Sequence, residues 1–131
     1  MEKKNKVKEE KKIILIIEDD EVLLRALYVF FHDSDYTIAS ATDGETAIDM
    51  TKRLKPDIVL LDLLLPKMDG FRYLELVRSM PEFKDLPIIV LSNLGDKADI
   101  DRAKNLGAND YFIKANVDLE KLSEAIKEIL K

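Results

Sequence analysis

Five short apolar runs alternate with five amphipathic stretches, and this alternation constrains the fold more than any other feature of the sequence. The runs are three to five residues long and mostly β-branched or leucine: Ile13–Ile17, Tyr36–Ser40, Ile58–Leu61, Ile88–Leu91 and Tyr111–Ile113. Three of them show no polar alternation, which is typical of strands that are covered on both faces. We therefore expect five strands of a parallel sheet.

The stretches between these runs repeat apolar residues at helical spacing. They are Glu21–Phe31, Glu45–Leu54, Phe71–Met80, Asp96–Leu106 and Asp118–Leu130. Gly107 marks the end of the fourth helix. Asp118 suits the N-cap of the fifth helix, and Val117 and Leu122 are spaced as a hydrophobic staple. Strict alternation of strand and helix predicts a single doubly wound α/β domain, a (βα)5 unit with helices on both faces of its sheet.

Composition excludes several classes of site. The chain of 131 residues contains no cysteine, which excludes disulfides, thiolate catalysis, zinc fingers and iron–sulfur clusters. Its one histidine, His32, rules out a multi-histidine metal site. No apolar run approaches the roughly 20 residues of a membrane span, and no signal-peptide pattern opens the chain. We expect a cytoplasmic protein with no membrane partner.

Charge divides the chain into two parts. Residues 1–12 contain six lysines and three glutamates, a net charge of +3, and Val7 is their one apolar side chain after Met1. We expect a charged flexible tail there and a folded domain over 13–131. The overall charge of −5 leaves −8 on the domain, which argues against direct binding of nucleic acid.

Polar side chains follow the predicted strands directly. Glu18 and Asp19 come after the first strand, Asp62 after the third, Ser92 after the fourth and Lys114 after the fifth. Ligands bind beyond the carboxyl ends of the strands in an open doubly wound sheet. The sequence therefore places three carboxylates, a hydroxyl and an ammonium at one edge of the domain.

The chemistry of this set favours phosphoryl transfer. Asp19 and Asp62 would repel each other in a shared cleft unless a cation or a raised pKa offsets their charge. Oxygen ligands without imidazole or thiolate suit Mg²⁺, with Mn²⁺ as the second choice. A carboxylate can attack phosphorus to form an aspartyl phosphate. Lys114 and Ser92 would then supply a second positive charge and a hydroxyl donor. Asp20, by contrast, fits a helix N-cap better than a site residue.

These residues are familiar as a set. The segments IILIIEDDEVLLR, PDIVLLDLLLPKMDGF, PIIVLSN and GANDYFIK resemble the receiver domains of two-component response regulators. The resemblance covers about residues 12–131, and the chain is similar to receivers of the stand-alone, chemotaxis-regulator type. It implies the flavodoxin-like strand order 2-1-3-4-5.

The resemblance also implies a role for each strand-end residue. Asp62 would be the phosphoacceptor, and Asp19 a direct Mg²⁺ ligand. Glu18 would reach the metal through water, and the backbone carbonyl of Leu64 would complete the protein ligands. Lys114 would pair with Asp62 or with its phosphate.

Two further residues are implied as parts of a switch. Ser92 would hydrogen-bond a phosphate oxygen, and Tyr111 would follow it as the aromatic switch residue. Pro66 and Gly70 would shape the loop after the third strand. The face formed by the fourth helix, the fifth strand and the fifth helix would then dock an unknown downstream protein.

The sequence departs from the family pattern at three positions. Ala115 follows Lys114 where the family usually has proline, so we expect a trans peptide there. Asn93 is larger than the usual small residue after the serine. Leu64 is apolar where many relatives are polar, and we hypothesise that it shields the acyl phosphate from water.

The expected function is that of a phospho-acceptor signalling domain without an output domain of its own. Its phosphodonor would be a sensor histidine kinase or a histidine phosphotransfer protein, and it would be a monomer or a phosphorylation-linked homodimer. It would catalyse only its own phosphorylation and dephosphorylation. The alternatives are a pseudo-receiver that binds partners without phosphorylation and, more remotely, a phosphohydrolase, which would want a second carboxylate at the position of Leu64.

Overall fold

The five predicted strands form one parallel sheet in the computed structural model, which describes residues 11–32 and 34–131. The strands are β1 (Lys12–Ile17), β2 (Tyr36–Ala41), β3 (Ile58–Leu61), β4 (Ile88–Ser92) and β5 (Asp110–Ile113). Their spatial order is β2-β1-β3-β4-β5, which confirms the order 2-1-3-4-5 that the resemblance implied. The two edge strands are those whose sequences are least continuously apolar.

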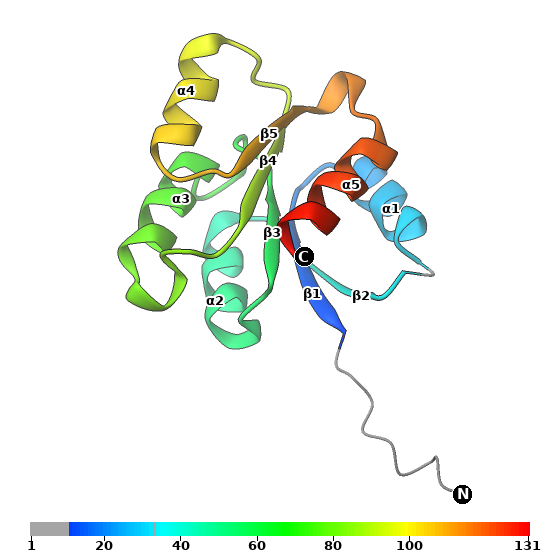
Figure 1. The fold of residues 1–131 in the computed structure, drawn as a ribbon. Coiled ribbons are helices and arrows are strands. Elements are labelled where there is room, and N and C mark those ends of the chain that lie inside the picture. The colour runs from blue at the N-terminus through cyan, green and yellow to red at the C-terminus, as the bar shows by residue number, and fades with distance from the viewer. Residues whose placement is uncertain (1–10, 33) are drawn as a thin grey trace, which may run out of the picture.

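The five predicted helices are also present. They are α1 (Glu21–Phe30), α2 (Gly44–Leu54), α3 (Gly70–Ser79), α4 (Lys97–Asn105) and α5 (Leu119–Ile129). Figure 1 shows α1 and α5 on one face of the sheet and α2, α3 and α4 on the other. Two short 3-10 helices, η2 (Pro81–Phe83) and η3 (Lys114–Asn116), were not predicted from the pattern.

The central strands divide the core into two layers because successive side chains point to opposite faces. In β1, Leu15 and Ile17 pack with α2 and α3, whereas Ile14 and Ile16 pack with α1 and α5. The strands β3 and β4 alternate in the same way, and all of their residues are buried. This two-sided burial explains why these strands read as continuous apolar runs.

An aspartate stands at the N-cap of every α-helix. Four of these carboxylates accept hydrogen bonds from the first amides of their helices: Asp20, Asp43, Asp69 and Asp118. The fifth, Asp96 of α4, makes no such bond. The predicted capping roles of Asp20 and Asp118 are therefore confirmed.

The predicted boundary after the tail needs a small correction. Lys12, which we assigned to the tail, is the first residue of β1 and pairs with Tyr36 of β2, because the parallel ladder extends one residue beyond the apolar run. The rest of the predicted tail falls mainly on residues 1–10, which lie outside the described residues. Within the described part of the chain, no helix has the length and apolar character that a membrane crossing requires.

Candidate functional site

Strand register brings Glu18 and Asp62 together. Ile17 at the end of β1 pairs with Leu61 at the end of β3, so the next residue of each strand occupies the same edge of the sheet. The Asp62 amide donates to the carbonyl of Ile17 at 3.0 Å, and the Glu18 amide donates to the carbonyl of Ala41 at 2.9 Å. Both acids are thus held by the backbone at the first positions beyond the strands, as predicted.

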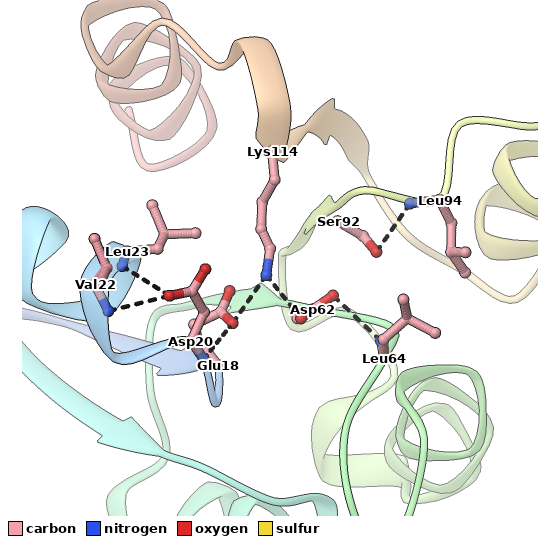
Figure 2. A network of polar contacts seen from close by, with 9 residues as sticks. All are labelled: Glu18, Asp20, Val22, Leu23, Asp62, Leu64, Ser92, Leu94 and Lys114. Atoms are coloured by element: carbon pink, nitrogen blue, oxygen red, sulfur yellow. Dashed lines mark hydrogen bonds and ion pairs between the residues drawn. The ribbon is translucent and has the colours of Figure 1, made fainter.

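Lys114 lies between these two carboxylates (Figure 2). Its Nζ atom is 3.0 Å from Oε2 of Glu18 and 3.1 Å from Oδ2 of Asp62. The side chains of all three residues are largely buried, with exposed fractions of 11% for Lys114, 2% for Glu18 and 3% for Asp62. The predicted pairing of Lys114 with Asp62 is present in the geometry. The described residues contain no cis peptide, so the bond from Lys114 to Ala115 is trans, as we expected.

Burial dominates the electrostatics of Glu18. Removal of its carboxylate from water raises its pKa to about 7, although hydrogen bonds from the Asp20 amide and from Lys114 oppose the shift. For Lys114, burial alone would lower the pKa, but the hydrogen bonds to Glu18 and Asp62 outweigh it and raise the pKa. Lys114 therefore stays charged at neutral pH, and Glu18 is close to its titration midpoint.

Asp19 completes a cluster whose donor set suits a hard divalent cation. Glu18, Asp19 and Asp62 each offer a carboxylate oxygen, and these oxygens lie within 4.8 Å of one another. Glu18 and Asp62 are buried, while Asp19 is exposed. The ligands are all oxygens, the preference of Mg²⁺ and Mn²⁺. Asp20 points its carboxylate at the amides of α1 instead, with its side-chain oxygen 3.0 Å from the Val22 nitrogen.

The loop after β3 fixes the backbone of Asp62. The Leu64 amide donates to Oδ1 of Asp62 at 3.2 Å, so both carboxylate oxygens of Asp62 have partners. Gly70 packs so tightly that a Cβ atom there would lie 2.6 Å from the Asp62 carbonyl oxygen. The Leu64 side chain itself is 55% exposed. Gly70 therefore shapes this loop as expected; the roles of the Leu64 carbonyl and side chain remain predictions.

Ser92 and Tyr111 meet at a residue that the sequence did not single out. The Ser92 hydroxyl is fully buried and accepts a long hydrogen bond, 3.4 Å, from the Leu94 amide. The Tyr111 hydroxyl donates to the carbonyl of the same Leu94. Burial raises the pKa of Tyr111, as do the charges of Asp99 and Asp62, so its hydroxyl remains a donor. Leu94 acts through its backbone, and no side-chain pattern could have revealed it.

These contacts define what the site can do chemically. It holds the Asp62 carboxylate at a fixed backbone position, close to the Lys114 ammonium and to the carboxylates of Glu18 and Asp19. The buried hydroxyl of Ser92 lies at the end of the neighbouring strand. Among the described residues, it is hydrogen-bonded to the Leu94 amide and not to a carboxylate. Such a set is suited to bind a phosphoryl group and neutralise its charge.

Known proteins are similar to this chain in sequence and in fold. Residues 14–127 match the response regulator receiver domain family. The DNA-binding dual master transcriptional regulator RpaA of Synechocystis is 31% identical over 114 residues, which are 87% of this chain and 47% of that protein. The chain spans less than half the length of the first curated relatives that it matches.

Two solved structures add detail. The phosphorylated cyanobacterial phytochrome response regulator RcpA is 30% identical, with a TM-score of 0.78 over 91% of both chains. The Mn²⁺-bound form of the response regulator Rcp1 is 28% identical, with a TM-score of 0.76 over 90% of this chain and 91% of that one. Together with the family match over most of the chain, these likenesses show that the protein belongs to the receiver domain family of two-component response regulators.

Proposed function

We propose that this chain accepts a phosphoryl group on Asp62 and that the resulting aspartyl phosphate changes which partner the domain binds. One observation carries the proposal: the buried Asp62 carboxylate lies 3.1 Å from the Lys114 ammonium, inside an oxygen cluster that fits a divalent cation. Phosphorylation and partner switching are general to the receiver family. The phosphorylated relative RcpA supports the phosphorylation, and the Mn²⁺-bound relative Rcp1 supports the divalent cation.

In the proposed reaction, an Asp62 oxygen attacks the phosphorus of a phosphohistidine. The oxygen–phosphorus bond forms as the phosphorus–nitrogen bond breaks, and the imidazole leaves with the electron pair of that bond. Lys114 holds the carboxylate in place and remains protonated, so that its charge balances the incoming oxygens. A divalent cation held by Glu18, Asp19 and Asp62, with the Leu64 carbonyl, would neutralise charge on the phosphoryl oxygens.

The new phosphate gives Ser92 and Lys114 a stronger partner than they have now. A shift of the Ser92 side chain toward the phosphate would weaken its already long bond from the Leu94 amide. The Leu94 carbonyl also accepts the hydrogen bond of the Tyr111 hydroxyl. A movement of Leu94 would therefore release the Tyr111 side chain. The face formed by α4, β5 and α5 would change as a result, and we propose that a downstream protein reads this face.

The phosphodonor would dock beside the site, on α1. Val22 and Val29 of this helix are 81% and 71% exposed, unusual values for large apolar side chains. Together with Leu119 they line a cavity of about 550 Å³ between α1 and α5. The cavity begins just past Asp19 and ends near the segment that follows Lys114, so an apolar helix seated there would present its histidine to Asp62.

The donor side of the proposal predicts a split between two assays. Val22→Asp should slow phosphotransfer from a phosphohistidine-bearing protein at least tenfold, because it places a charge in the apolar contact. Labelling by acetyl phosphate, a small molecule that needs no docking surface, should stay within twofold. Equal loss in both assays would mean that Val22 acts on the site and not on docking.

A pseudo-receiver that works without phosphorylation is the second candidate. It would leave the Asp62–Lys114 pair as a purely structural ion pair. A phosphohydrolase is disfavoured because the position two residues after Asp62 is Leu64, which has no group for acid–base catalysis.

The deciding experiment records the intact mass of the protein after incubation with Mg²⁺ and acetyl phosphate. We expect one added phosphate, absent without Mg²⁺ and absent in Asp62→Asn. Asp20→Asn is the matched control, since Asp20 caps α1 and lies two residues from Glu18, and it should still be labelled. If acetyl phosphate, a phosphohistidine donor and beryllofluoride all fail on folded protein, the pseudo-receiver function replaces this one.

A further inference from the structure

The C-terminal end of α4 is firmly attached to its neighbours. The Arg78 guanidinium, on α3, donates to the Gly107 carbonyl at 2.7 Å. The amides of Gly107 and Ala108 donate back to the carbonyls of Lys104 and Ala103, each at 3.0 Å, and so close the last turn of the helix. Gly107 adopts a φ of 108°, which only glycine adopts without strain.

The N-terminal end of α4 has fewer attachments, the nearest being the hydrogen bond from the Tyr111 hydroxyl to the Leu94 carbonyl. Asp96 stands at the N-cap position, but its carboxylate caps no amide. Gly95, just before it, lies in open space: a Cβ atom there would meet only the tip of Ile113, at 3.7 Å. The exposed ion pair of Lys97 with Asp101 lies within the helix and ties it to nothing else.

Two side chains join the middle of α4 to the rest of the domain: Ala103 is buried in the core cluster that contains Phe71, and Arg102 contacts the ring of Phe71. The Arg102 guanidinium lies over the Phe71 ring, 4.0 Å from its centroid. Phe71 is only 6% exposed. It follows Gly70, whose amide donates to the Leu63 carbonyl, so the ring belongs to the rigid start of α3. Ala103 is the one buried residue of α4, so the contact of the exposed Arg102 with Phe71 adds to a small set of contacts that hold this helix against the domain.

We infer that α4 is a hinged helix that opens from its N-terminal end about Gly107, and that Arg102 seated on Phe71 is the latch that keeps it closed. The inference concerns the chain before any phosphorylation and goes beyond the proposed function. Opening would lift the start of α4 and break the hydrogen bond between Tyr111 and the Leu94 carbonyl, while Arg78 holds the other end. The firm bonds near Gly107 and the uncapped start at Asp96 are the two observations that set the direction of opening.

Amide hydrogen exchange of the unphosphorylated protein tests the latch. Arg102→Gln should accelerate exchange in α4 about fivefold, the factor expected for one arginine–aromatic contact. Lys104→Gln is the matched control, because it removes the same charge from the last turn of the same helix without touching a ring. It should change exchange less than twofold, and amides of α1 and α5 should be unaffected by both variants. Arg102→Lys should give an intermediate result.

A second variant and an internal gradient complete the test. Phe71→Leu keeps the apolar bulk but removes the ring face, so it should accelerate α4 as Arg102→Gln does, and the double variant should add nothing further. The amides of Ile100 and Ala108 are both hydrogen-bonded, and the hinge requires Ile100 to exchange faster. Equal acceleration in Arg102→Gln and Lys104→Gln, acceleration of every helix, or faster exchange at Ala108 would overturn the inference. None of these readouts involves Asp62 chemistry, so they leave the proposed function untouched.

Discussion

The helices α3 and α4 lie on the same face of the sheet and follow strands that carry site residues, yet they are built very differently. α3 follows the strand of Asp62 and buries half of its ten residues: Gly70, Phe71, Tyr73, Leu74 and Val77. α4 follows the strand of Ser92 and buries Ala103 alone. Asp69 caps α3 through the Arg72 amide, whereas Asp96 caps nothing.

Under the proposed function, this contrast separates the part of the site that would accept the phosphoryl group from the part that would change conformation in response. A nucleophile must be held in place before the reaction, and α3 fixes the backbone of Asp62 through Gly70. A switch needs an element of low local stability, and the sparsely buried, uncapped α4 beside Ser92 would supply one. The backbone on the Asp62 side of the site should therefore be rigid, and the backbone on the Ser92 side should change conformation more easily.

The largest effect on stability is expected from a substitution that disrupts the backbone on the Asp62 side of the site. Gly70→Ala would place a methyl group 2.6 Å from the Asp62 carbonyl oxygen and 2.7 Å from the Leu63 Cα. Backbone atoms cannot move aside as a flexible side chain can, so we expect a loss of about 3 kcal/mol in unfolding free energy. Urea denaturation measures it.

Gly95→Ala is the matched change on the yielding side. Its new methyl group would lie 3.7 Å from Ile113, which is ordinary contact. We expect a change within about 0.5 kcal/mol of zero. Similar losses at Gly70 and Gly95 would contradict the contrast between the two helices.

The next effect concerns the buried acid on the rigid side. Glu18 titrates near pH 7 in the folded chain and near its ordinary value of 4.5 when unfolded. Between these values the folded state binds more protons than the unfolded state, so stability falls as pH rises and levels off above 7. We expect wild-type protein in EDTA to lose about 2–3 kcal/mol relative to Glu18→Gln between pH 4.5 and 8.

Magnesium should oppose this loss, because a cation favours the ionised carboxylate. Urea unfolding at both pH values, with EDTA and with excess Mg²⁺, measures both effects. Glu124→Gln, which removes an exposed carboxylate from α5, is the control. A wild-type curve parallel to that of Glu18→Gln across the whole range would show that burial does not perturb Glu18.

The difference between α3 and α4 lies beyond what the sequence could predict. Strands, helices and the strand-end residues follow from local periodicity and from the geometry of a parallel sheet, and the structure places them as predicted. Asp69 and Asp96 both stand at the N-cap position, before α3 and α4 respectively, but only the first side chain forms its cap. That outcome depends on loop conformation, as does the role of the Leu94 backbone. Neither can be predicted from the residue types at these positions.

This pair of aspartates allows a smaller test. Asp69→Ala removes a hydrogen bond of 2.9 Å to the Arg72 amide and should cost about 1 kcal/mol of unfolding free energy. Asp96→Ala removes no cap and should cost about 0.3 kcal/mol or less, the remainder of a helix-dipole interaction. Thermal or urea unfolding distinguishes the two. An equal cost would show that Asp96 does cap α4 in solution. The conclusion that the N-terminal end of α4 is weakly attached would then be wrong.

The smallest effect expected is kinetic and rests on the proposed phosphorylation. The hydrogen bond from the Leu64 amide to Asp62 keeps this exposed leucine beside the acceptor, on the rigid side of the site. An apolar side chain held there would exclude water from the acyl phosphate, so Leu64→Asn should speed its hydrolysis about threefold. Leu64→Met keeps an apolar side chain and should leave the rate unchanged. Loss of the added phosphate mass over time measures the rate, and an unchanged rate in Leu64→Asn would mean that water reaches the phosphate from the Ser92 side, past the looser start of α4.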